Sequence, residues 1–447
     1  MEAVGIDERR LESTQDQIWI SMSLLPILQL QGKERMGAIL NSDHPKELFQ
    51  ALPEEEAYFT IKEIGEQDAL PLLSLMSNEQ CQYLLDIELW KGYEIQLEKV
   101  ERWLPLLLSC DYEAVGRWLR SLDIDTLLLI LKKTIRIHLK DSEEITIPQN
   151  GARAYFTLDG TYYIEVLKPS LQSQIEQLLK ILGNSDLNLH WKVLTQVNWE
   201  IGAELEERAL HFREARLEDK GFPPMEEALS LYQYLNSDRL KKMLEQKEIH
   251  LPEIPEETPL PSFPMVLKDQ SLFFSLCLRE LEGGPVFDRL KMELTYLANQ
   301  VMVADQPERI DISTIQGSLK KVGGYLSLGL ELLSEGSVQR AREWVEQIPL
   351  KFLFQVGFGA SLELKWRAEK LWQNAKFSEK GTPPSFLGSP WEERMEGLLK
   401  KRPLFYDESE VGYREFRSLE EIRSLHHDLD KIESIQNGSS KRKGCEG

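Results

Sequence analysis

Four carboxylates and one imidazole recur along residues 189–219 at spacings that place them on one side of a helix. They are Glu200, Glu204, Glu207, His211 and Glu214. At about 100° per residue, these positions fall within a wedge of roughly 80°. Such a stripe could bind a hard or borderline metal cation, or bring two carboxylates close enough to perturb each other's titration. The alternatives are a solvated edge, with Arg208 offsetting the repulsion, and a surface on which a partner docks.

A second pair of potential metal ligands lies near the C-terminus, where His426 and Asp430 are one helical turn apart. Two ligands are too few for a site and no third is evident nearby, so a surface helix is the alternative. The chain contains no G-x-S-x-G, H-E-x-x-H or G-x-x-x-x-G-K-[ST] motif. We therefore assign no catalytic residue and no cofactor.

Two glycine-containing stretches invite comparison with loops that bind phosphate. Gly357-Phe358-Gly359-Ala360-Ser361 lacks a preceding strand and a following lysine, and we interpret it as a helix-breaking turn. We interpret Gly323-Gly324 as a close-packing or turn element.

The elements that would carry these residues are mainly helices. Residues 189–219 have an apolar side spaced by three, four or seven positions, which predicts one long amphipathic helix. That side consists of Trp191, Leu194, Val197, Ile201, Leu205 and Phe212. Core packing is the default role for the tryptophans, Trp191 and Trp199 included. The alternative is that some of them anchor an interface, where tryptophan is enriched.

Residues 44–136 contain a degenerate internal repeat, in which two apolar residues, two variable residues and a Leu or Met precede a helix-starting residue. Its copies run from Leu48 to Pro53, from Leu72 to Ser77 and from Trp118 to Asp123. Ser and Asp accept the free N–H groups of a helix start, and Pro is tolerated in a first turn. One such helix pair cannot bury its apolar face alone, so neighbouring pairs must stack. The predicted fold class is mainly α, a superhelical helix-repeat architecture with a small β-hairpin insertion.

This repeat region also resembles a known domain. The run His44-Pro45-x-x-Leu48-Phe49-x-x-Leu52-Pro53-Glu54-Glu55, followed by Asp68-Ala69-Leu70, is similar to the cytosolic N-terminal domain of MgtE-type magnesium transporters. The resemblance implies a right-handed superhelix of short helices over the N-terminal part of the chain. No transmembrane segment follows in the sequence, so transport itself is not implied.

The whole chain resembles an uncharacterised bacterial family of unknown function. The stretches that carry this resemblance are Arg216-Leu217-Glu218-Asp219-Lys220-Gly221-Phe222-Pro223-Pro224-Met225-Glu226-Glu227-Ala228 and Arg402-Pro403-Leu404-Phe405-Tyr406. The resemblance implies no activity.

The predicted organisation has five parts. A helical-repeat domain at 15–140 is followed by a β-hairpin with long helices at 141–248, where Asp159-Gly160 is the turn signal. Residues 249–264 contain five prolines and predict an extended connector. A C-terminal helical domain spans 265–436, with a last charged helix at 417–435, and residues 437–447 are expected to be a disordered tail.

Composition limits the possible partners and compartment. The 74 acidic and 53 basic side chains give a net charge of −21, which disfavours nucleic-acid binding. Four scattered cysteines fit a reducing compartment, and the N-terminus shows no signal-peptide pattern, so we expect a cytoplasmic protein without a transmembrane segment. The oligomeric state is left open.

Three functional hypotheses follow from the sequence. The leading one is a non-enzymatic interaction or scaffold protein that presents a stacked-helix surface to a protein partner. A cation-responsive, Mg²⁺-type regulatory module is the alternative, and an enzyme of unrecognised type is a further one.

Overall fold

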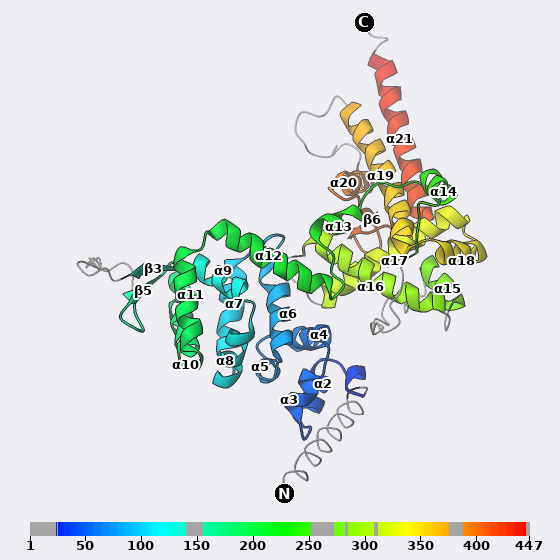
Figure 1. The fold of residues 1–447 in the computed structure, drawn as a ribbon. Coiled ribbons are helices and arrows are strands. Elements are labelled where there is room, and N and C mark those ends of the chain that lie inside the picture. Colours follow the sequence, from blue (N-terminus) through cyan, green and yellow to red (C-terminus); the bar gives the residue numbers. More distant parts are fainter. Residues whose placement is uncertain are drawn as a thin grey trace. The chain divides into compact units, whose positions relative to one another are not determined.

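The computed structural model describes residue 24 and residues 26–139, 155–251, 272–281, 285–307, 312–374 and 388–443. The fold is mainly α-helical with small antiparallel sheets, which confirms the predicted class (Figure 1). Two compact units are formed, one from Met1–Lys220 with Gln306–Ile312 and the other from Gly221–Asp305 with Ser313–Gly447. Most of the predicted connector at 249–264 lies outside the described residues, and the five-part organisation stays a prediction.

The N-terminal unit is a succession of helices with short connections. Its helices are α2 (Gly32–Leu40), α3 (Pro45–Gln50), α4 (Glu54–Ile64), α5 (Leu70–Leu73), α6 (Asn78–Glu88), α7 (Leu97–Leu108), α8 (Tyr112–Ser121), α9 (Ile124–Thr134), α10 (Gln172–Ser185), α11 (Leu187–Trp199) and α12 (Gly202–Glu218). Figure 1 shows α7 to α11 in a row, with α12 running across it.

All three copies of the repeat have the predicted helix starts. Pro53 immediately precedes α4. Ser77 caps α6 in a capping box with Gln80, and the Asp123 carboxylate accepts hydrogen bonds from the first turn of α9. These caps satisfy N–H groups that have no partner within the helix. The regular superhelical winding of the copies stays a prediction.

A three-stranded antiparallel sheet interrupts the helices, with strand order β3 (Ile135–Leu139), β5 (Tyr162–Val166), β4 (Tyr155–Phe156). The predicted hairpin turn is confirmed, since Gly160 has φ +71° and the Asp159 carboxylate accepts from the Thr161 and Tyr162 amides. A second hairpin, β1 (Trp90–Lys91) with β2 (Glu94–Ile95), was not anticipated.

The prediction of a single long helix over 189–219 is wrong. The backbone leaves the helical region at Glu200 (ψ 141°) and Ile201 (ψ 123°), so α11 ends at Trp199 and α12 begins at Gly202. Val197 and Leu205, on either side of the break, are buried, whereas Ile201, expected on the apolar side, is 59% exposed.

The C-terminal unit consists of longer helices and a small hairpin. Its elements are α13 (Met225–Ser230), α14 (Ser237–Glu245), α15 (Phe273–Glu280), α16 (Pro285–Asp305), α17 (Ile312–Ser334), α18 (Val338–Gln347), α19 (Leu350–Asn374), α20 (Trp391–Leu399), β6 (Phe405–Asp407), β7 (Gly412–Arg414) and α21 (Leu419–Lys443). Glu335 and Gly336, both with positive φ, form the turn between α17 and α18. The charged C-terminal helix is present but runs to Lys443 instead of 435.

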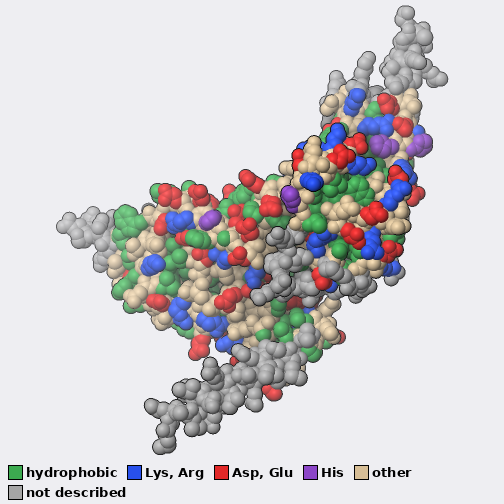
Figure 2. Space-filling model, turned by 45° about the vertical axis from the view of Figure 1, so that its right-hand side comes forward, with side chains coloured by type: hydrophobic (Ala, Val, Ile, Leu, Met, Phe, Trp, Pro, Cys, Tyr) green, Lys and Arg blue, Asp and Glu red, His purple; other side chains and the backbone are tan. Residues whose placement is uncertain are grey.

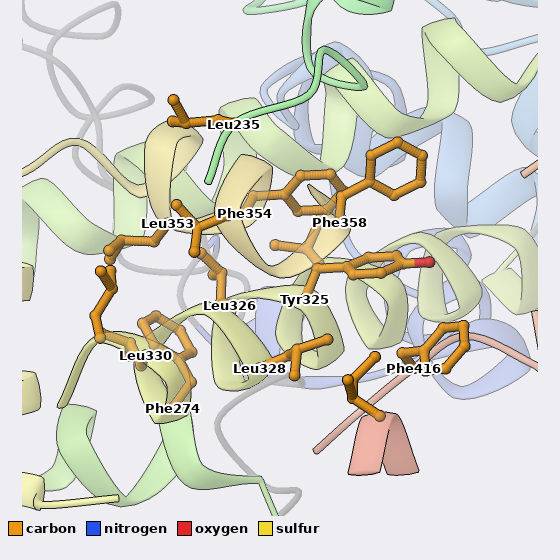
Figure 3. Close-up of a cluster of buried hydrophobic side chains, with 14 of the residues drawn as sticks. Leu235, Phe274, Tyr325, Leu326, Leu328, Leu330, Leu353, Phe354, Phe358 and Phe416 are labelled. Carbon is orange, nitrogen blue, oxygen red and sulfur yellow. The ribbon is translucent and has the colours of Figure 1, made fainter. Parts of the chain in front are cut away.

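Aromatic side chains fill the core between α17 and α19. The Tyr325 ring contacts those of Phe354 and Phe358, with centroids 5.1 and 5.4 Å apart (Figure 3). The two helices approach closely at Gly329 and Gly357, where an added Cβ on either glycine would lie 2.1 Å from a carbonyl oxygen of the other helix.

The prediction of a helix-breaking turn at 357–361 is therefore wrong. These residues lie within α19, and their glycines allow backbone contact between helices because they have no Cβ. Gly324 has the close-packing role expected for Gly323-Gly324, since its added Cβ would lie 2.4 Å from the Phe416 carbonyl oxygen.

Candidate interaction surface

The acidic stripe is divided by the break between α11 and α12. Glu200 directly follows α11, and its carboxylate pairs with the Arg208 guanidinium at 3.2 Å. Glu204, Glu207 and His211 are exposed on α12, and Glu214 is partly exposed. Among the described residues, no three His, Cys, Asp or Glu side chains are grouped so that they could hold a metal ion. The structure thus gives the stripe no shared ligand geometry, and the metal hypothesis for it stays a prediction.

The C-terminal pair of potential ligands is joined by an arginine. Arg367 of α19 pairs with Asp430 and lies 3.3 Å from Nδ1 of His426. Both side chains of the predicted pair thus contact a cation of this chain, a contact that the helical spacing alone did not reveal.

The side of α12 that contacts the helices of the N-terminal unit is basic. Arg208 pairs with Asp125 of α9 at 3.0 Å, and Arg216 pairs with Asp86 of α6 at 2.7 Å. Lys220, just after α12, pairs with Glu54 at 2.7 Å. The sequence drew attention to the acidic side of this helix, whereas its basic side makes the contacts that fix its position. Arg216, which opens the first family-like stretch, is one of these residues.

A second polar cluster lies in the C-terminal unit. It contains Tyr232, Asp305, Lys321, Tyr325, Arg402 and Glu415, which come from separate segments. Lys321 lies 3.0 Å from Asp305 and 2.7 Å from Glu415, and Arg402, from the second family-like stretch, also pairs with Asp305. The two positive charges of this cluster therefore balance the negative charges of its two carboxylates.

The titration of this cluster does not favour nucleophilic or base catalysis. Burial alone would lower the pKa of Lys321, but the charges and hydrogen bonds of Glu415 and Tyr232 together outweigh burial and raise that pKa. Burial raises the pKa of Tyr232. A protonated lysine and a neutral tyrosine are poor nucleophiles, so the cluster serves to join helices and hairpin.

An apolar cavity of about 60 Å³ lies among α6, α7, α8, α9 and α10. Trp103, Trp118 and Cys81 are among its lining side chains. At about 15 Å³ for each water-sized sphere, it has room for roughly four. This space suits a small apolar group and is too small for a nucleotide or a flavin.

The outward side of α11 is apolar and exposed. Leu187, Trp191 and Trp199 are 51%, 46% and 73% exposed, and Ile201, two residues beyond Trp199, is 59% exposed. At about 100° per residue, the first three span roughly 120° of the helix circumference, with the exposed Thr195 between the two tryptophans. The opposite side carries the buried Val193, Leu194 and Val197 and packs on α9, α10 and β3.

This apolar side also lacks negative charge. The thirteen residues of α11 include no Asp or Glu and one lysine, Lys192, in a chain of net charge −21. Figure 2 shows hydrophobic side chains at the left of the view, the side on which Figure 1 places β3, β5, α10 and α11. Exposed apolar residues grouped in this way mark interaction sites more often than scattered ones do.

The tryptophans in the described part of the N-terminal unit thus divide into two groups. Trp90, Trp103 and Trp118 are buried, as core packing predicts, whereas Trp191 and Trp199 are exposed. The sequence left both roles open for these residues, because a helical spacing of apolar residues does not say which side meets the core. The exposed pair is the feature that we take as the candidate site.

None of the helices among the described residues combines the length and the apolar character that a membrane-spanning helix needs. In comparisons with known proteins, neither a curated protein nor a solved structure matches the chain. The resemblance to MgtE-type transporters is therefore not shown. A family model described as "Family of unknown function (DUF6178)" matches residues 12–441, which include both stretches that suggested such a family. The chain therefore belongs to this family of unknown function.

Proposed function

We propose that the protein is a non-enzymatic, cytoplasmic interaction protein that binds a helix of a partner protein on the outward side of α11. The observation that carries the proposal is the 73% exposure of Trp199, on the same outward side as Trp191 and Leu187. Tryptophan contributes more binding free energy than most residues when an interface covers it. The three described cysteines are free and buried, which supports a reducing compartment.

The shape and charge of this side indicate the kind of partner. At 1.5 Å per residue, α11 is about 20 Å long, which matches a partner helix whose apolar residues recur every three or four positions. Acidic residues beside those apolar positions would pair with Lys192 and meet no carboxylate on α11. The net charge of −21 would repel an acidic helix from the chain on average, so the lack of carboxylates on α11 favours docking there.

Site-specific photo-crosslinking tests the proposal in cells of the native host. A photoreactive phenylalanine replaces Trp199 in one variant and Trp366 in another. Trp366 lies on α19 and is 46% exposed, like Trp191, so it controls for exposure of an aromatic residue. We expect a discrete crosslinked protein from position 199, mapped to a helical peptide with acidic residues, and none from position 366.

A double variant, Trp191→Ser with Trp199→Ser, should lose the captured partner, and Trp366→Ser should keep it. A crosslink from position 199 to a second copy of the chain would replace the proposed partner with self-association. Equal crosslinking from positions 199 and 366 would contradict a specific surface on α11.

A further inference from the structure

Two cationic side chains lie against one buried tryptophan in the N-terminal unit. Trp90 begins β1, directly after α6, and is 3% exposed. The guanidinium carbon of Arg213, from α12, lies 5.2 Å from the centre of the Trp90 ring. The ammonium of Lys99, from α7, donates to the Trp90 carbonyl oxygen at 3.0 Å. Two elements, α7 and α12, thus bring a positive charge to the same residue of β1.

Neither cation forms an ion pair with another described residue. Within 4.0 Å, no carboxylate of the described part of the chain reaches Arg213 or Lys99. The other cations on the inward side of α12, Arg208 and Arg216, each pair with two carboxylates. An unpaired couple of cations is unexpected in a chain with 74 acidic and 53 basic side chains.

The surroundings of Arg213 and Lys99 disfavour the charged forms of both side chains. Burial lowers the pKa of Arg213 to about 10, and the charges of Asp86 and Glu214 only partly oppose this shift. Burial also lowers the pKa of Lys99; Glu88 opposes this shift, whereas Arg213 and Lys91 add to it. A counter-charge would relieve this cost, because a desolvated cation is stabilised most by a close anion.

Part of the hydrogen-bonding capacity of this group is already used. Arg213 Nε donates to the Asp86 carbonyl oxygen at 2.8 Å, near the C-terminal end of α6, where the helix dipole favours a cation. The Trp90 indole N–H is buried and makes no hydrogen bond with any described residue. Arg213 and Lys99 are themselves only partly buried, so solvent reaches both.

We propose that Arg213 and Lys99, backed by Trp90, form a binding site for an oxyanion, either a carboxylate or a phosphate group. The two terminal guanidinium nitrogens bind two oxygens of the anion side by side, in the geometry that arginine offers to planar or tetrahedral oxyanions. The Lys99 ammonium makes the third contact with the anion and supplies the second positive charge. The Trp90 ring packs against the guanidinium and helps to fix its orientation.

Thermal melts of the full chain in phosphate, acetate and chloride at matched ionic strength test this site. A specific anion raises the melting temperature in proportion to ln(1 + [L]/Kd). We expect a larger rise in phosphate or in acetate than in chloride, and the stronger of the two identifies the group that the site prefers. Equal rises in all three salts would overturn the proposal.

Variants separate binding from the general effect of charge. Lys99→Gln should raise the Kd for the preferred anion at least about tenfold, since a charge-assisted hydrogen bond contributes about 1.5–3 kcal/mol. Lys46→Gln removes the same charge from an exposed position of α3 and should leave that Kd unchanged. Arg213→Lys keeps the charge but loses the paired nitrogens, and should weaken binding similarly.

If Arg213→Lys does not fold, Lys99→Gln carries the test alone. Unchanged anion affinity in Lys99→Gln would contradict the site. The assay requires no partner protein and leaves the apolar side of α11 intact, so its failure is distinguishable from failure of the proposed interaction function.

Discussion

Arg216 and Asp86 connect α12 to α6 through a two-point ion pair. Arg216 Nε lies 2.7 Å from one carboxylate oxygen and Nη2 lies 2.9 Å from the other. The Asp86 side chain is 1% exposed and that of Arg216 is 31% exposed. Asp123, which caps α9, also contacts the guanidinium at 3.5 Å. One arginine thus holds three helices of the N-terminal unit together.

Replacing Arg216 should therefore destabilise this unit strongly. Arg216→Met leaves the Asp86 carboxylate buried without its cation, and breaking a buried pair in this way costs about 3–5 kcal/mol. Urea unfolding measures the loss. Asp86→Leu combined with Arg216→Met should recover much of it, because no buried charge remains. Arg120→Met, at an exposed position of α8, is the control, and a loss no larger than the control's would contradict the role of the pair.

Glu88 should make the stability of the N-terminal unit depend on pH. Burial alone would raise its pKa, but the charge of Lys62 and hydrogen bonds from Lys62, Tyr58 and Trp103 outweigh burial and lower the pKa below 4.5. A carboxyl with a lowered folded-state pKa stabilises the fold above its unfolded pKa and loses that contribution as pH falls through the folded value.

The measurement is the urea midpoint across the pH range just below 4.5, the ordinary value for this side chain. The wild type should lose stability there more steeply than Glu88→Gln, which should already be less stable at neutral pH. Glu79→Gln, at an exposed position of the same helix, should unfold like the wild type. Parallel pH curves for the wild type and Glu88→Gln would show that Glu88 is not the titrating group.

Close contact between α17 and α19 should make Gly357 intolerant of a side chain. An added Cβ would lie 2.1 Å from the Tyr325 carbonyl oxygen. Gly357→Ala should therefore separate the helices and cost about 1–3 kcal/mol or more. Gly317→Ala, on α17 with nothing within 4 Å of the added Cβ, should instead stabilise by about 0.5–1 kcal/mol, as alanine does in a helix. Thermal melts of both variants distinguish packing from helix propensity, and a stabilised Gly357→Ala would be inconsistent with this contact.

The exposed tryptophans of α11 should contribute little to folding. Trp191→Ser with Trp199→Ser should change the unfolding free energy by no more than about 0.5 kcal/mol for each residue, as expected at exposed positions. The same variant should bind less of a dye that fluoresces on apolar surfaces. Trp103→Ser, at a position 1% exposed, should cost at least about 3 kcal/mol. Comparable losses in the two variants would mean that α11 is covered in solution.

The sequence by itself determined the local features of this protein. Helix starts at Pro53, Ser77 and Asp123 and the turn at Asp159-Gly160 were predictable, because a cap or a tight turn depends on residues within a few positions of one another. The mainly α class followed from the same short-range patterns, and the two stretches opened by Arg216 and Arg402 indicated the family.

Only the tertiary structure decided which sides of the helices meet. Periodicity joined 189–219 into one helix, whereas packing broke it at Glu200 and turned the basic side of α12 towards Asp86 and Asp125. The sequence around Gly357 favours a helix-breaking turn, because the contact of this glycine with α17 arises only when the helices pack. Trp103 and Trp199 have the same side chain, and one is buried while the other is exposed. Burial depends on long-range contacts, which local spacing does not encode.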